Sequence, residues 1–136
     1  MATTPNYANG VVVGAGVVAT GDTSRTTPNN KTTILTAGSS GTRVERVSFA
    51  AIGATTASLL RLFLYDGTAY HLLREITVPA ITPASGSLPV WQTTHEAWST
   101  PNLMPILLPN GWSIVAAIND TQSGGGVKVI AEGANF

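Results

Sequence analysis

The chain has 136 residues, of which 43% are hydrophobic and 10% charged, and its seven basic and seven acidic side chains leave no net charge. This length fits one domain with a core of its own. The scattered basic residues form no stripe that could neutralise phosphates, which argues against nucleic-acid binding. The absence of cysteine excludes disulfides and thiolate zinc sites.

The sequence also predicts no membrane attachment, because no apolar run approaches the ~20 residues that span a bilayer. The first ten residues lack the basic and apolar blocks of a signal peptide, so we expect synthesis in a cytoplasm. A surface with so few charges is poorly soluble by itself, since self-repulsion is weak. This composition favours a surface that a partner covers.

Residues 1–30 are predicted to form an extended N-terminal arm. They are rich in Thr, Gly, Asn and Ala, and Gly14 and Gly16 interrupt their one apolar island. The stretch over residues 21–30 has no periodicity and indicates a loop. Two interpretations stay open: the segment is a disordered terminus, or it is an arm that becomes ordered on a neighbouring subunit. The apolar island consists mainly of Val11, Val12, Val13, Val17 and Val18.

From residue 31 to residue 136 the sequence predicts a single all-β domain. No helical periodicity extends over ten residues, and turn signals recur every 8–12 residues. About eight short strands in this pattern predict an antiparallel β-sandwich that is jelly-roll-like. Strands are expected over residues 31–37, 42–51, 57–65, 69–78, 90–98, 111–118 and 127–133, with a proline-restricted edge segment over 101–111.

Three local features of these strands are predicted. The parity of Val44 differs from that of the following apolar residues, which indicates a bulge near Glu45. The strand over residues 57–65 is apolar on both faces. Asp66-Gly67 between two apolar runs predicts a hairpin with a type I′ turn.

The residues that carry chemistry are few, and none of them forms a recognisable site. The glycines of residues 14–21 lack the spacing and the βαβ context of a dinucleotide-binding loop. His71 and His95 are two isolated histidines, whereas a metal site usually takes three or four clustered ligands. No serine completes a triad with His71 and Asp66. We therefore expect no catalytic residue, no cofactor, no metal ion and no enzymatic activity.

The aromatic residues form the other cluster of interest. Trp91, Trp98 and Trp112, with Tyr65 and Tyr70, could stack on sugars or anchor a protein partner. Trp112 lies in an apolar strand, which favours a place in the core. Trp98 lies in a loop-like stretch, so that an interface role and a core role both remain open.

Two segments carry a resemblance to a known group of proteins. LLRLFLYDGTAYHLLREITVPAIT places an Asp-Gly turn before a strand that ends near proline, and LMPILLPNGWSIVAAI opens a late strand with LPNG. Over about residues 32–132 the chain resembles the head decoration, or cement, proteins of tailed bacteriophages. The resemblance implies a jelly-roll fold and a place on an icosahedral capsid, where such proteins staple neighbouring coat subunits. It consists of turn residues, so it carries over no functional residue, and it does not explain the arm.

The leading hypothesis is a virion structural protein, made in the host cytoplasm, that binds the outer surface of a phage capsid and stabilises the shell. Its expected partners are the major capsid protein and further copies of itself, as a dimer or trimer. The alternative is a carbohydrate- or receptor-binding β-sandwich of a phage tail or fibre, and a third possibility is a small β-sandwich enzyme. The residues expected at the interface are Val11, Val12, Val13, Val17, Val18, Trp98, Leu103 and Met104.

Overall fold

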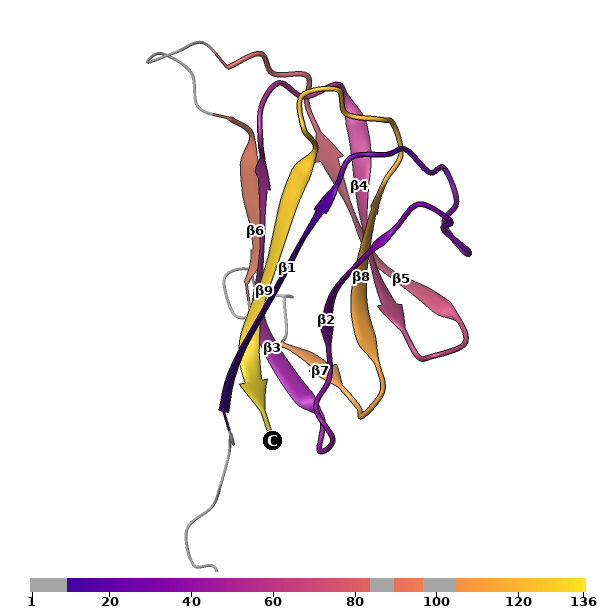
Figure 1. Cartoon of the computed structure of the whole chain (residues 1–136), viewed down its shortest axis with the longest axis vertical. Coiled ribbons are helices and arrows are strands. Elements are labelled where there is room, and N and C mark those ends of the chain that lie inside the picture. Colours follow the sequence, from indigo (N-terminus) through magenta and orange to yellow (C-terminus); the bar gives the residue numbers. More distant parts are fainter. Residues whose placement is uncertain (1–9, 84–89, 97–104) are drawn as a thin grey trace, which may run out of the picture.

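The computed structural model describes residues 10–83, 90–96 and 105–136, and these form nine β-strands and no helix (Figure 1). The all-β class predicted from the sequence is confirmed, with nine strands where about eight were expected. The strands are β1 (Gly10–Val18), β2 (Thr32–Thr36), β3 (Thr42–Ala51), β4 (Ser58–Tyr65), β5 (Tyr70–Val78), β6 (Gln92–Glu96), β7 (Ile106–Leu108), β8 (Ser113–Ile118) and β9 (Val127–Asn135).

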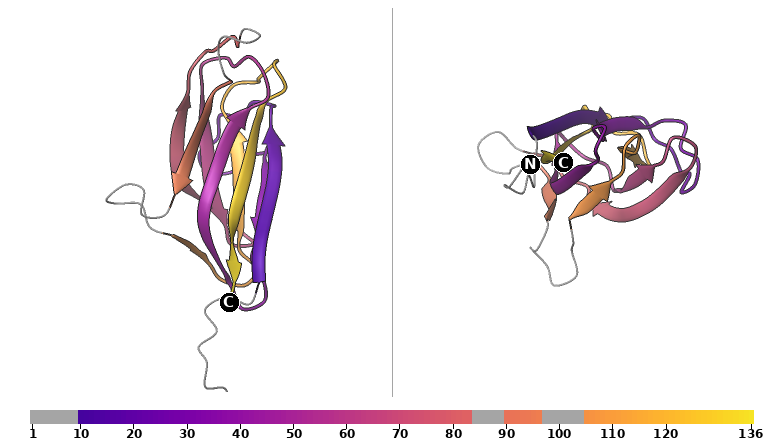
Figure 2. Two further views of the ribbon diagram at one scale, coloured as in Figure 1. Left: turned by 90° about the vertical axis from the view of Figure 1, so that its left-hand side faces the viewer. Right: turned by 90° about the horizontal axis from the view of Figure 1, so that it is seen from below.

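The strands form two antiparallel sheets that pack face to face (Figures 1 and 2). The five-stranded sheet has the order β1-β9-β3-β6. β6 pairs with the C-terminal part of β3, and β7 pairs with the N-terminal part of β3. The four-stranded sheet has the order β2-β8-β4-β5. Most consecutive strands lie in opposite sheets. The exceptions are the β4–β5 hairpin and the pair β6 and β7, whose two strands belong to the same sheet. This order confirms the jelly-roll-like sandwich.

The core lies between the sheets and follows from period-two alternation. In β3, Val47 and Phe49 are buried while Arg46 and Ser48 point outward. The register of β3 against β9 shifts between Val44 and Arg46, which confirms the predicted bulge. The buried core residues include Val18, Ile34, Leu35, Val44, Val47, Phe49, Leu60, Leu62, Ile76, Val78, Ile106, Leu108, Ile114, Ala116, Ile118, Val127, Val129 and Ala131.

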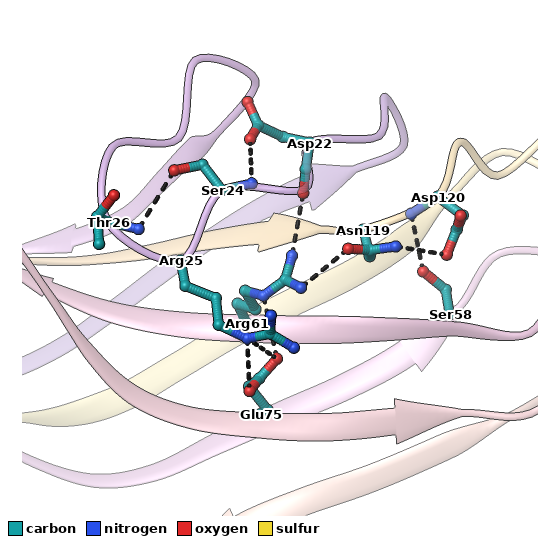
Figure 3. Close-up of polar contacts among 9 residues, drawn as sticks. All are labelled: Asp22, Ser24, Arg25, Thr26, Ser58, Arg61, Glu75, Asn119 and Asp120. Carbon is teal, nitrogen blue, oxygen red and sulfur yellow. Dashed lines mark hydrogen bonds and ion pairs between the residues drawn. The ribbon is translucent and has the colours of Figure 1, made fainter.

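A second, smaller apolar cluster lies on the outer face of the four-stranded sheet. Phe63, Val115 and Ala117 are fully or almost fully buried there, with Tyr65 and Tyr70 packed against them. This explains why β4 is apolar on both faces. The segment over residues 19–31 also lies against this face, where the backbone oxygen of Asp22 accepts from Arg61 and Lys31 Nζ lies over the Tyr70 ring (Figure 3).

The predicted hairpin at Asp66-Gly67 is confirmed, but its turn is longer than expected. The last cross-strand pair is Tyr65–Tyr70, and Asp66 N donates to Ala69 O. The turn therefore spans four residues instead of two. Gly67 adopts φ 96°, the left-handed conformation that favours glycine.

The structure differs from the predicted arm over residues 10–18, which form a strand of the sandwich itself. β1 pairs with β9 along its whole length, from Gly10 opposite Asn135 to Val18 opposite Val127. From the sequence alone, the glycines of this segment indicate at best a weak strand. In the fold they allow β2 to approach, because a Cβ on Gly14 would overlap the carbonyl oxygen of Ile34. The loop predicted over residues 21–30 is confirmed, since no strand begins until Thr32.

Candidate interaction surface

The outer face of the five-stranded sheet carries four of the eight exposed large hydrophobic side chains of the described residues. Every second side chain of its strands points away from the core. The pairing registers place these side chains in rows that run across β1, β9 and β3. This outer face comprises Val11, Val13, Ala15 and Val17 of β1, Lys128, Ile130, Glu132 and Ala134 of β9, Arg43, Arg46, Ser48 and Ala50 of β3, and Leu107 of β7.

Its apolar members are strongly exposed. The exposed fraction is 86% for Val11, 64% for Val13, 41% for Val17 and 62% for Leu107. Single exposed apolar residues are common on protein surfaces, but a contiguous group of them marks an interaction site. In the row that begins with Val11, Ala134 stands directly beside it, and Arg43 of β3 separates these two from Leu107. The exposed apolar side chains of the face therefore lie on β1, β9 and β7.

Three of the four charged members of the outer face, Arg43, Arg46 and Glu132, stand beside groups of opposite sign. Arg43 forms an ion pair with Glu45. Arg46 stands opposite Glu132 across the β3–β9 pair, and its Nε donates to Ser48 Oγ over 3.1 Å. The face therefore carries no strong field of either sign, and electrostatic attraction would contribute little to its binding.

The structure brings together three of the eight residues predicted for the interface. Val11, Val13 and Val17 share the outer face. Val12 faces inward and packs against the core, and Val18 is buried in it, so neither contributes a surface. The alternation of β1 causes this separation. The remaining three, Trp98, Leu103 and Met104, lie outside the described residues.

Ile130, Ala134 and Leu107 complete the face and were missed by the sequence analysis. Ile130 had a usable signal, because Val127 and Val129 fix the inward parity of β9 and leave Ile130 on the other side. For Leu107 the neighbouring prolines hid the three-residue strand in which it lies.

On the opposite sheet, a buried arginine anchors the segment over residues 19–31 (Figure 3). Arg61 is 1% exposed and donates to three acceptors: Glu75 Oε2 at 3.1 Å, the backbone oxygen of Asp22 at 3.0 Å, and Asn119 Oδ1 at 2.9 Å. Arg25, from the same segment, also donates to Glu75. A buried charge needs this number of partners. These hydrogen bonds hold the segment over residues 19–31 in place, and they occupy the polar groups of Arg61 and Glu75 within the fold.

The carboxylates of this region are held in their charged form. Backbone amides, first that of Asn30 and then that of Ser24, donate to Asp22 and lower its pKa. The hydrogen bond from Arg25 lowers the pKa of Glu75, with a further contribution from Arg61. Both groups are therefore ionised at neutral pH, and neither is tuned for proton transfer.

The pairing of His71 with Asp66 is the other contact that a catalytic site could use. His71 Nε2 lies 2.9 Å from Asp66 Oδ2, and its ring stacks on Trp112. Asp66 also accepts from the amides of Thr68 and Ala69, and these bonds, with that of His71, lower its pKa to about 2. The Asp66 carboxylate thus stabilises the turn by accepting its backbone amides, which is a structural role.

The aromatic residues do not assemble into one exposed platform among the described residues. Tyr65 and Tyr70 stack on each other with ring centroids 4.4 Å apart, and Lys31 Nζ lies 5.4 Å from the Tyr70 centroid. Trp91 and Trp112 pack against the main core.

A polar cleft of about 630 Å³ lies between residues 21–29 and residues 119–121. Most of its polar atoms already have partners: the Asp22 carboxylate accepts backbone amides, Thr121 Oγ1 accepts from Gly21 N, and Asn119 binds Arg61 and Asp120. These bonds connect the two loops to each other.

Within residues 10–83, 90–96 and 105–136, no group of three or more His, Asp and Glu side chains could hold a metal ion. The same part of the chain contains no helix of the length and apolarity that a membrane span needs. Comparison with protein-family models, with curated proteins and with solved structures found no match.

Proposed function

We propose that the protein is a structural component of a virion that binds the outside of an icosahedral phage capsid and staples neighbouring coat subunits. The observation that carries this proposal is the outer face of the five-stranded sheet, a surface with exposed valines and a leucine on a β-sandwich. A stapling protein needs such a surface and no reactive group.

The binding would be adhesive and driven mainly by burial of apolar surface. Each Å² of apolar area removed from water contributes ~25 cal/mol before the cost of association is subtracted. A stable interface of standard size buries ~1,200–2,000 Å² in total. A subunit that bridges coat proteins only in their assembled arrangement stabilises that arrangement by mass action.

The test is co-sedimentation of the purified protein with capsids of the virus that encodes it, prepared without this protein. We expect the protein to sediment with the particles and to stay bound in washes from ~0.05 to ~1 M salt, because an apolar interface has little Coulomb attraction to screen. Release of the protein at high salt would contradict a shape-based interface. Binding to host glycans without binding to capsids would favour a receptor-binding module instead.

A matched pair of variants locates the binding surface. Ile130 lies in the middle of the outer face on β9, whereas Leu72 is an exposed apolar residue of β5 on the other sheet. Ile130→Lys places a charge in the proposed interface and should reduce particle binding at least ~10-fold. Leu72→Lys adds the same charge elsewhere and should leave binding unchanged. Equal effects of both substitutions would exclude the outer face as the binding surface.

A further inference from the structure

The border strand of the five-stranded sheet presents an open edge. β1 has β9 as its one neighbour in the sheet, and the left view of Figure 2 shows it at the border. Natural proteins usually protect such an edge with charges or proline, because an unprotected edge pairs with other strands. β1 has the sequence GVVVGAGVV and carries neither.

The hydrogen-bonding direction of each β1 residue follows from two backbone hydrogen bonds at the ends of β9. Ile52 N donates to Gly126 O and Phe136 N donates to Gly41 O, so the even-numbered residues of β9 bond toward β3. The odd-numbered residues of β9 therefore bond toward β1, where their partners are the even-numbered residues 10–18. The odd-numbered residues of β1 direct their N–H and C=O groups away from the sheet. In agreement, Val17 O accepts from Thr32 Oγ1.

The open part of this edge is its N-terminal half. From Gly14 onward β1 approaches β2, because a Cβ on Gly14 would overlap the carbonyl oxygen of Ile34 and a Cβ on Gly16 would lie 2.5 Å from Thr32 Cγ2. A Cβ on Gly10, in contrast, would meet no atom within 4 Å. The outward-directed backbone groups in the open half are those of Val11 and Val13, whose side chains are also the two most exposed among the valines of the strand.

We propose that a second copy of this chain pairs with this edge, β1 antiparallel to β1, around a two-fold axis at Val12. In this register Val11 of each copy stands opposite Val13 of the other, and each such pair exchanges both N–H···O bonds. The interface is self-complementary, as two-fold symmetry requires. Because β1 carries no charge, no like charges meet across it.

The pairing joins two five-stranded sheets into one and makes their outer faces continuous. A short strand pair buries less than the ~1,200 Å² of a standard interface, so the dimer dissociates on dilution. The proposed β1–β1 pairing is a property of the purified protein alone and does not rest on the proposed capsid binding.

The first test is sedimentation velocity of the purified chain from ~10 µM to ~1 mM. We expect a concentration-dependent dimer. Val13→Pro removes an N–H that points away from β9, so it spares the β1–β9 ladder and should weaken association at least ~10-fold. A monomer at every concentration would overturn the proposal, and so would undiminished association of a folded Val13→Pro variant.

A cross-linking pair tests the register even if Val13→Pro fails to fold. The chain has no cysteine, so one introduced thiol reports on one position. Val12→Cys places two thiols across the two-fold axis, where the Cα–Cα distance of ~4.5 Å suits a disulfide. Val17→Cys is the control: it is more exposed, but its two copies would lie ~33 Å apart along the strands. Under mild oxidation we expect the Val12→Cys dimer to form at least ~10-fold faster. Equal or slower cross-linking at Val12 would refute this pairing, whatever the result with capsids.

Discussion

Substitution of Gly14 by alanine tests whether β1 is a strand of the sandwich. Gly14 faces β2, and a Cβ there would overlap the carbonyl oxygen of Ile34 and lie 3.0 Å from Leu35 Cβ. The obstacle is partly backbone, which cannot rotate away as a side-chain end can, so the two strands must separate. Forced overpacking of this kind costs ~1–3 kcal/mol.

Gly10→Ala is the matched control, because Gly10 lies on the same strand with the same parity and has open space around its Cα. Both substitutions remove the same chain entropy from the unfolded state, a stabilisation of ~0.4–1 kcal/mol where the site accepts alanine. Gly10→Ala should therefore be neutral or slightly stabilising, and Gly14→Ala destabilising.

Urea unfolding followed by circular dichroism measures both variants. With a slope of ~1–3 kcal/mol per M, we expect the midpoint of Gly14→Ala to fall by roughly 1 M at unchanged slope. If both variants had the same midpoint, β1 would not pack on β2, and residues 10–18 would be an arm after all.

Three further predictions follow from the hairpin and from the buried arginine. Gly67→Val should destabilise the domain by ~1–3 kcal/mol in thermal unfolding, because φ 96° is strained for a β-branched residue; an unchanged melting temperature would contradict the turn. Asp66, whose pKa is lowered from 3.8 to about 2 in the fold, stabilises the folded state above pH 3.8, and this contribution is lost as pH falls toward 2. Asp66→Asn should therefore flatten the loss of stability between pH 4 and pH 2, and an unaltered acid profile would show that the carboxylate is not held by the turn. Asn119→Ala leaves a buried N–H of Arg61 without its acceptor and should cost ~1–3 kcal/mol in urea unfolding, whereas an unchanged midpoint would mean that Arg61 is not held as the structure has it.

The sequence predicted best where the relevant partner lies nearby along the chain. The alternation around Phe49, the bulge near Glu45 and the Asp66-Gly67 hairpin depend on residues within one strand or two adjacent ones. Each has its own local signal, either a change of parity or a turn dipeptide.

The sequence predicted worst where the partner lies far away. β1 pairs with β9 across more than a hundred residues, and the reason for Gly14 appears only when β2 is placed beside it. For the candidate site, the valines of β1 were predicted to lie at an interface. Which of them are on the surface and which are in the core depends on the β1–β9 register.

The pairing of β1 with β9 has a consequence for how the protein is made. These are the first and last strands of the described fold, so β1 has no partner in its sheet until residues 127–135 have left the ribosome. Until then its valines and their unbonded amides are exposed to solvent, and they can associate wrongly. Sheets that depend on such distant pairings also fold slowly, because a long loop must close before any contact stabilises it. The strand with the most exposed apolar residues is thus also among the last to be secured, which makes chaperone binding and low expression temperature relevant to its yield.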